Sequence, residues 1–202
     1  MNKKVLLSIG AIVLVCALIF IVAVSKPEKI KETPSEIFTE ALTDTTRERF
    51  TVTVNGDVIS PEEIEYFAKR NREKVMNDYA SRYDISVVEN FWYSRFDGVI
   101  PEDTLYDICL ENAVQYKVAF QLMKENGIYD TTSYADFYKM AQEYNKNNEG
   151  QNVTSGLSRI DLDNFYTYYF SSGKAKLEKI TGTLDIDSYI NDKINEAEII
   201  NR

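Results

Sequence analysis

The chain has 202 residues, of which 44% are hydrophobic, and its formal net charge is −9. An anionic surface of this strength repels phosphate backbones, so nucleic acid is not expected among its partners. The chain has no histidine and only two cysteines, Cys16 and Cys109. The missing histidine excludes Ser-His-Asp and Cys-His catalysis and removes the commonest zinc ligand. We therefore expect no catalytic residue, no metal site and no cofactor, and we interpret both cysteines as small buried hydrophobes.

The N-terminal region contains an uncharged apolar stretch over residues 5–24, flanked by Lys3, Lys4 and Lys26. A stretch of this length can cross a bilayer as a helix, whereas a secretory signal usually has only about 7–15 apolar residues. We expect residues 1–25 to be a signal anchor in the cell membrane and residues 26–49 a polar tether, with the domain on the extracytoplasmic side. Cleavage after Ala23-Val24-Ser25, which would release a secreted protein, and lipid attachment at Cys16 remain alternatives.

Residues 50–130 carry the strongest local signals and predict a β-hairpin followed by two paired helices. β-forming residues flank Asn55-Gly56, and both turn residues tolerate positive φ. Ser60-Pro61-Glu62-Glu63 supplies an N-cap hydroxyl, a proline at the first helical position and a carboxylate at the third. This helix should end at about Tyr83. The second helix should begin at Pro101 and end at Asn126-Gly127, a left-handed C-cap.

An aromatic segment separates these two helices. Phe91, Trp92, Tyr93 and Phe96 fall within six residues, and a solvated loop cannot bury so many rings. Two interpretations remain open. Either Phe91 and Trp92 close the open end of the helical hairpin, or the segment is an exposed aromatic contact for unfolded chains.

The C-terminal third predicts three further helices. One should begin at one of the several caps that Asp130-Thr131-Thr132-Ser133 offers and run to about Asn147, and a second should begin after Asp161 and end at Gly182. Ser171-Ser172-Gly173 could kink or interrupt that second helix. The last helix is expected over residues 185–199.

Within the second of these helices, aromatic residues exceed what one buried face requires. Phe165 and Tyr169 share one side of the helix, so Tyr168 and Phe170 should point away from it. They either pack against another segment or line a groove for client polypeptides.

Two pairs of aspartates resemble cation ligands at first sight. Asp161 and Asp163, and Asp185 and Asp187, have i, i+2 spacing. Neither pair is followed by the glycine and distal glutamate of a calcium loop. We predict instead that they cap helices, because carboxylates favour helix N-termini.

The order of these features resembles the N-terminal chaperone region of exported SurA-like and PrsA-like foldases, over about residues 50–199. The residues that carry the resemblance are Val54-Asn55-Gly56-x-x-Ile59-Ser60, the long helix, Phe91-Trp92, Pro101 and Lys124-Glu125-Asn126-Gly127. The resemblance implies a mainly α domain over residues 50–202 that cradles unfolded polypeptide. In those proteins a separate parvulin-type domain performs prolyl isomerisation. The sequence stops at Arg202, about where that domain would begin, and lacks the histidines typical of its site, so no catalytic residue is carried over.

The sequence as a whole predicts a membrane-anchored, extracytoplasmic, chaperone-like protein that binds unfolded or secreted polypeptides. The alternatives are a non-catalytic subunit of a membrane complex and a homologue of foldase-type prolyl isomerases without the catalytic domain. Binding should be weak and broad, because apolar contacts read little sequence. The residues predicted to contact the client are Trp92, Tyr93, Phe96, Tyr168 and Phe170.

Overall fold

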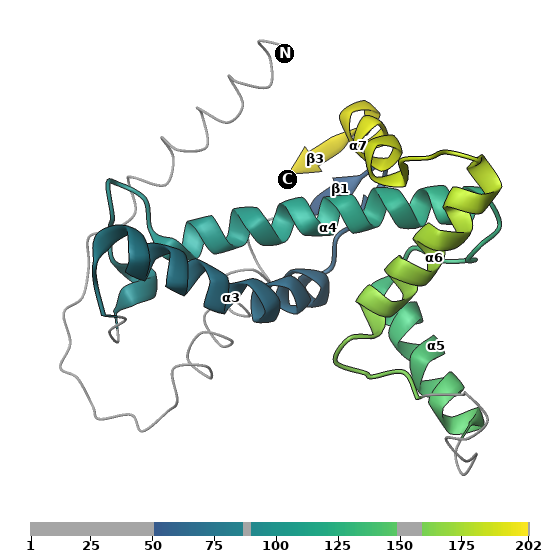
Figure 1. Ribbon diagram of the computed structural model, residues 1–202, viewed down its shortest axis with the longest axis horizontal. Coiled ribbons are helices and arrows are strands. Elements are labelled where there is room, and N and C mark those ends of the chain that lie inside the picture. The colour runs from purple at the N-terminus through teal and green to yellow at the C-terminus, as the bar shows by residue number, and fades with distance from the viewer. Residues whose placement is uncertain (1–50, 87–89, 149–158, 202) are drawn as a thin grey trace. The chain divides into compact units, whose positions relative to one another are not determined.

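A computed structural model describes residues 51–86, 90–148 and 159–201. The described residues all belong to one compact unit. This part is mainly α-helical with a small three-stranded sheet, as expected from the sequence (Figure 1). The predicted anchor over residues 1–25 and tether over residues 26–49 lie outside the described residues. Within the described ranges, no helix has the length and apolar character needed to cross a bilayer.

The fold begins with the predicted hairpin, formed by β1 (Val52–Val54) and β2 (Asp57–Val58). The two turn residues, Asn55 and Gly56, have φ values of 51° and 88°, as a type I′ turn requires. This turn matches the right-handed twist of the strands, so the Asn-Gly step determines the hairpin locally.

Two long helices follow, α3 (Pro61–Tyr83) and α4 (Pro101–Glu125), with the boundaries predicted from their caps. Ser60 and Glu63 form a complete capping box at the start of α3. After α4, Gly127 has a φ of 68° and ends the helix in the left-handed region.

The two helices lie side by side, and the aromatic segment between them closes one end of the pair (Figure 1). Phe91 and Trp92 belong to a short 3-10 helix, η2 (Phe91–Tyr93), and are only 1% and 7% exposed. The ring of Tyr79 on α3 contacts those of Phe91 and Phe96, with centroid distances of 5.9 and 5.3 Å. The interpretation of Phe91 and Trp92 as a plug is therefore confirmed.

The helices α5 (Tyr134–Asn147) and α6 (Phe165–Thr181) contact each other, and α6 also contacts α4. Helix α6 continues through Ser171-Ser172-Gly173, so of the two possibilities considered there, a kink or an interruption, the interruption does not occur. Gly173 lies against Met123 and Tyr129, and its lack of a side chain permits this close approach. Phe170 stacks on Tyr116 of α4 at 3.8 Å between ring centroids.

The end of the described chain differs from the sequence prediction. Helix α7 (Ile186–Glu196) is capped by Asp185, as expected, but ends before Ala197. The next residues form β3 (Ile199–Asn201), which pairs antiparallel with β1. The sheet order is β2-β1-β3. The prediction of one helix over residues 185–199 was wrong at its C-terminal end, because pairing with a distant strand replaces the last helical turn.

Candidate functional site

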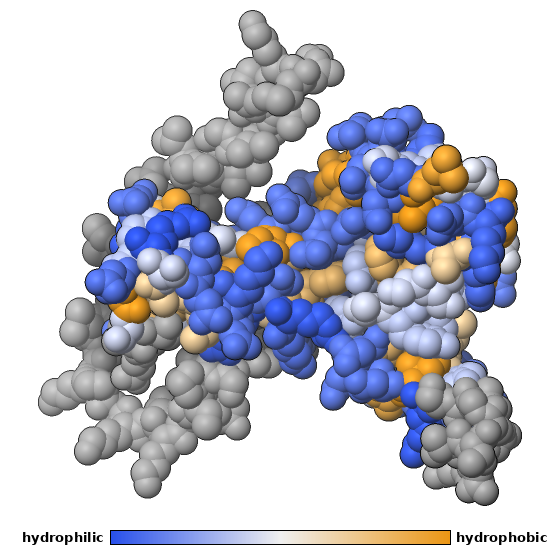
Figure 2. Space-filling model, in the orientation of Figure 1, coloured by the Kyte–Doolittle hydropathy of each residue, from blue (hydrophilic) through white to orange (hydrophobic). Residues whose placement is uncertain are grey.

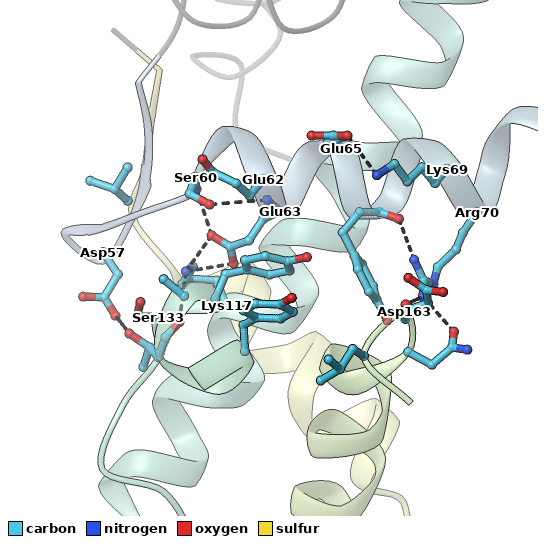
Figure 3. Close-up of a pocket in the computed structure, with 18 residues that line it drawn as sticks. Asp57, Ser60, Glu62, Glu63, Glu65, Lys69, Arg70, Lys117, Ser133 and Asp163 are labelled. Atoms are coloured by element: carbon cyan, nitrogen blue, oxygen red, sulfur yellow. Dashed lines mark hydrogen bonds and ion pairs between the residues drawn. The ribbon is translucent and has the colours of Figure 1, made fainter. Parts of the chain in front are cut away.

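A groove with a volume of about 1140 Å³ opens between four parts of the domain (Figure 3). Its borders are β2, the first three turns of α3, the start of α5 and the turn that precedes α6. These parts are far apart in sequence, so the groove exists only in the folded chain. Its lining includes a buried ion pair, three tyrosines and a set of charged side chains at the rim.

The floor of the groove is the ion pair between Glu63 of α3 and Lys117 of α4. The two residues are 0% and 2% exposed, and Lys117 Nζ lies 2.9 Å from Glu63 Oε1. Lys117 also donates to the Thr132 carbonyl at 3.1 Å, while Tyr166 Oη donates to Glu63 Oε1 at 2.5 Å. The Ser60 amide donates to Glu63 Oε2 at 2.8 Å. Both charges are thus surrounded by hydrogen-bond partners, as buried charges require.

This network keeps the phenol of Tyr166 protonated. Burial, together with the negative charge of Glu63, raises the pKa of Tyr166 well above its ordinary value. Tyr166 therefore stays neutral and remains a hydrogen-bond donor to the carboxylate. Within the described residues, every buried side-chain nitrogen and oxygen has a hydrogen-bond partner. The hydrogen-bond network at the floor therefore links α3, α4 and α6.

One wall of the groove consists of Tyr66, Tyr134 and Tyr138. The ring of Tyr134 contacts the ring of Tyr66 at 5.9 Å and that of Phe165 at 4.9 Å. Burial raises the pKa of Tyr134 to about 12, so its phenol is neutral at physiological pH. Tyr138 is the most accessible of the three, with 38% of its surface exposed. Tyr66 is only 4% exposed, so the ring surfaces and hydroxyl groups that the wall offers belong to Tyr134 and Tyr138.

The rim carries more negative than positive side chains (Figure 3). Lys69 pairs with Glu65 at 2.9 Å. The guanidinium of Arg70 lies 3.5 Å from the centroid of the Tyr66 ring and donates to Asn164 Oδ1 at 2.7 Å. Glu62 makes no ion pair with any other described residue.

Asp57 of β2 remains ionised at the edge of the groove. Burial works against its charge, but hydrogen bonds from Gln121 at 3.0 Å and Thr132 at 2.8 Å favour it. The positive charge of Lys117 acts in the same direction, and the net result is a lowered pKa for Asp57. Asp57 is therefore a fixed negative charge at this position.

The first aspartate of each i, i+2 pair accepts a hydrogen bond from a backbone amide nearby in the chain. Asp161 accepts from the Asp163 amide at 3.0 Å in the turn before α6, and Asp185 accepts from the Ser188 amide at 3.0 Å at the start of α7. The Asp185 prediction is confirmed, whereas Asp161 stabilises a turn, because Asn164 occupies the N-cap position of α6. In the part of the chain that the structure describes, no three His, Cys, Asp or Glu residues are placed to hold a metal ion.

The five residues predicted to contact a client are separated by the fold, and none of them lines the groove. Trp92 and Phe170 are only 7% and 8% exposed, because Trp92 packs in η2 and Phe170 stacks on α4. These two residues form part of the core and do not present a contact surface. Phe96 is half-buried against Tyr79 and Tyr83. Tyr93 and Tyr168 are exposed, at 51% and 48%.

No single large apolar patch is visible on the face drawn in Figure 2. Apolar areas on this face are small and separated by hydrophilic surface. Single exposed hydrophobic residues are normal for a globular domain. The groove is therefore a better candidate site than Tyr93 or Tyr168 alone.

The groove was not predicted from the sequence, although two of its residues, Glu63 and Lys117, carry signals that point to it. Glu63 was identified only as a helix cap, although its carboxylate also accepts from Tyr166 and Lys117. Lys117 lies on the apolar face of α4, between Ala113 and Phe120. A lysine at such a position requires a buried acidic partner. That requirement could have indicated an ion pair, but not which carboxylate supplies it.

No protein-family model, no curated protein and no solved structure matches this chain. The resemblance to SurA-like and PrsA-like foldases therefore rests on the sequence features given above. The geometry of the groove is the independent observation that bears on function.

Proposed function

We propose that this chain is a membrane-tethered, extracytoplasmic, chaperone-like protein of the SurA-like and PrsA-like kind, and that it binds unfolded polypeptide in the groove. The observation that carries the proposal is the open, tyrosine-walled groove between β2, α3, α5 and the turn before α6. The proposed anchor and tether would hold this groove outside the membrane.

The tyrosine wall suits a ligand of variable sequence. Tyr134 and Tyr138 provide large, rigid ring surfaces whose hydroxyl groups can also form hydrogen bonds, while Tyr66 is only 4% exposed and packs against Tyr134 from the core. Such side chains contact many partners at low entropic cost, because each has only two rotatable bonds. A volume of about 1140 Å³ accommodates several residues of an extended chain. Affinity for any one sequence should be weak, which a protein that releases its clients needs.

The first experiment compares two exposed tyrosines. Tyr138→Ser removes a ring from the groove wall, whereas Tyr168→Ser removes a similarly exposed ring from α6 that does not line the groove. We expect the unmodified chain to suppress aggregation of a reduced, unfolded secreted protein, with suppression lowered severalfold in Tyr138→Ser and retained in Tyr168→Ser. Light scattering measures the suppression, and urea unfolding verifies that both variants are folded.

The possible results separate three conclusions. No suppression by the unmodified chain at severalfold molar excess contradicts the proposed function. Loss in Tyr168→Ser with retention in Tyr138→Ser places the client surface on the exposed face of α6. Loss in Tyr138→Ser alone supports the groove.

A further inference from the structure

Among the described residues, no strand pairs with the outer edge of β2, which borders the groove. In β1 and β2, the Ile59 amide donates to the Val52 carbonyl at 2.9 Å, and Thr53 lies opposite Val58. Hydrogen-bonded and non-hydrogen-bonded pairs alternate along an antiparallel ladder. Thr53 and Val58 are therefore a non-hydrogen-bonded pair, and the N–H and C=O of Val58 point away from β1.

These two groups of Val58 have no hydrogen-bond partner among the described residues. Val58 is 52% exposed and lines the groove together with Asp57 and Ser60. An unpaired N–H and C=O on the same residue of an edge strand can form one hydrogen-bonded pair with an incoming antiparallel strand. The groove thus combines an open strand edge, a tyrosine wall and a charged rim.

The charge of the groove indicates which strands it favours. Five carboxylates line it against three cationic side chains, and Glu63, Glu65, Lys69 and Lys117 are already paired with one another. Asp57, Glu62 and Asp163 then remain against one cation, Arg70, and the pKa of Asp57, which lies in β2 itself, is lowered. Lysine or arginine side chains on an incoming strand would meet these negative charges and the tyrosine rings.

We propose that an extended, positively charged stretch of polypeptide docks in the groove by adding a strand to the open edge of β2. This inference rests on the proposed function and specifies how the client is held. Main-chain hydrogen bonds at Val58 supply contacts that do not depend on client sequence, as in other strand-addition complexes. The rim carboxylates select segments rich in lysine or arginine.

The sheet provides a matched control on its opposite edge. The Asn55 amide donates to the Glu198 carbonyl at 2.8 Å, and Val54 lies opposite Ile199. By the same alternation, the N–H and C=O of Ile199 point away from β1. Ile199 is 48% exposed and does not line the groove. Proline at either position removes an outward N–H and leaves the pairing with β1 intact.

The test measures binding of a labelled synthetic peptide that alternates lysine and threonine, by fluorescence anisotropy on the full chain in mild detergent. Val58→Pro should weaken binding about fivefold to tenfold, the loss expected for one hydrogen bond. Ile199→Pro, which removes the outward N–H at the opposite edge, should bind as the unmodified chain does. A peptide N-methylated on every second residue should bind the unmodified chain more weakly than its parent, and this measurement requires no mutation.

Each remaining outcome overturns a defined part of the proposal. Equal binding of the N-methylated and parent peptides contradicts strand addition, even if Val58→Pro fails to fold, while the proposed function stands. Equal binding of a peptide that alternates glutamate and threonine contradicts selection by charge. If the unmodified chain binds neither peptide nor an unfolded protein, the proposed function itself is wrong.

Discussion

Lys117 and Glu63 form the most consequential pair of side chains in the domain. Each is almost completely buried, and the network around them joins α3, α4, α6 and the residues before α5. The attraction within such a pair roughly offsets the cost of removing both charges from water. The pair therefore contributes little net stability while intact, but a single unpaired member is costly.

Replacing only the lysine should demonstrate this asymmetry. Lys117→Met leaves the Glu63 carboxylate buried without its cation, and we expect a loss of about 3–5 kcal/mol in the free energy of unfolding. Glu63→Gln combined with Lys117→Met should be less destabilised than Lys117→Met alone, because the introduced amide is neutral and its oxygen can still accept a hydrogen bond from Tyr166 or Ser60. Urea denaturation monitored by circular dichroism measures both variants. A loss below about 1 kcal/mol for Lys117→Met would show that water or rearrangement compensates for the missing charge.

At the scale of the elements, the contact between α4 and α6 depends on one glycine. A β-carbon added at Gly173 would lie 2.3 Å from Met123 Sδ and 2.8 Å from Tyr129 Cε2. Met123 is fully buried, and Tyr129 donates a hydrogen bond to the Tyr169 carbonyl at 2.9 Å. Neither neighbour can withdraw without disturbing the core.

Gly173→Ala should therefore destabilise the domain although alanine favours helices. The gain in helix propensity is about 1 kcal/mol, whereas overpacking a well-filled core costs about 1–3 kcal/mol. We expect a net loss of up to about 2 kcal/mol, measured by urea unfolding. Ser171→Ala is the control, because this exposed position on the same helix should change stability by no more than about 0.5 kcal/mol. A stabilised Gly173→Ala variant would mean that the two helices separate readily.

The elements whose boundaries depend on local chemistry were predictable from the sequence. The Asn55-Gly56 turn, the capping box at Ser60 and the C-cap at Gly127 each need only neighbouring residues. Strand β3, in contrast, depends on residues far away in the sequence. Ile190, Ile194 and Ala197 fit a helical period, and residues 199–201 form a strand because they pair with β1, far earlier in the chain. Nothing local distinguishes these two outcomes.

The same difference between local and long-range contacts explains why the candidate site was not predicted. Tyr134 and Tyr138 are four residues apart and so share one face of α5, yet whether that face meets a core or a groove depends on α3 and on the turn before α6. Trp92 and Phe170 were candidates because they lie in segments rich in aromatic residues. That richness does not show which rings the rest of the fold covers. A site assembled from four separate segments depends on packing that local patterns do not encode.

At the scale of the whole molecule, the hairpin turn connects the beginning of the described domain to its end. The Asn55 side chain donates to Gln121 Oε1 of α4 at 2.9 Å, and its Oδ1 accepts from the Glu198 amide at 2.8 Å. Asn55 thus has two roles. It adopts the positive φ of the turn, and it aligns β3 beside β1 for pairing.

Asn55→Gly separates these two roles, because glycine keeps the turn but has no side chain. We expect a loss of about 1 kcal/mol in the free energy of unfolding, since both lost hydrogen bonds are exposed. The sharper readout is hydrogen exchange at the Ile200 amide, which pairs with Thr53 in the β1–β3 ladder. Exchange there should accelerate while amides in the middle of α4 keep their protection.

Asp97→Gly is the matched control for this effect. Asp97 and Gly98 have φ values of 52° and 88°, almost the same turn as Asn55-Gly56, but they join Phe96 to Val99 and do not contact β3. This variant should leave exchange at Ile200 unchanged. Equal exchange at Ile200 in Asn55→Gly and the unmodified chain would show that β3 is held by α7 and not by the turn. Packing of α7 would then hold the end of the described chain in place, and the hairpin's remaining role would be to supply the strand edge that borders the groove.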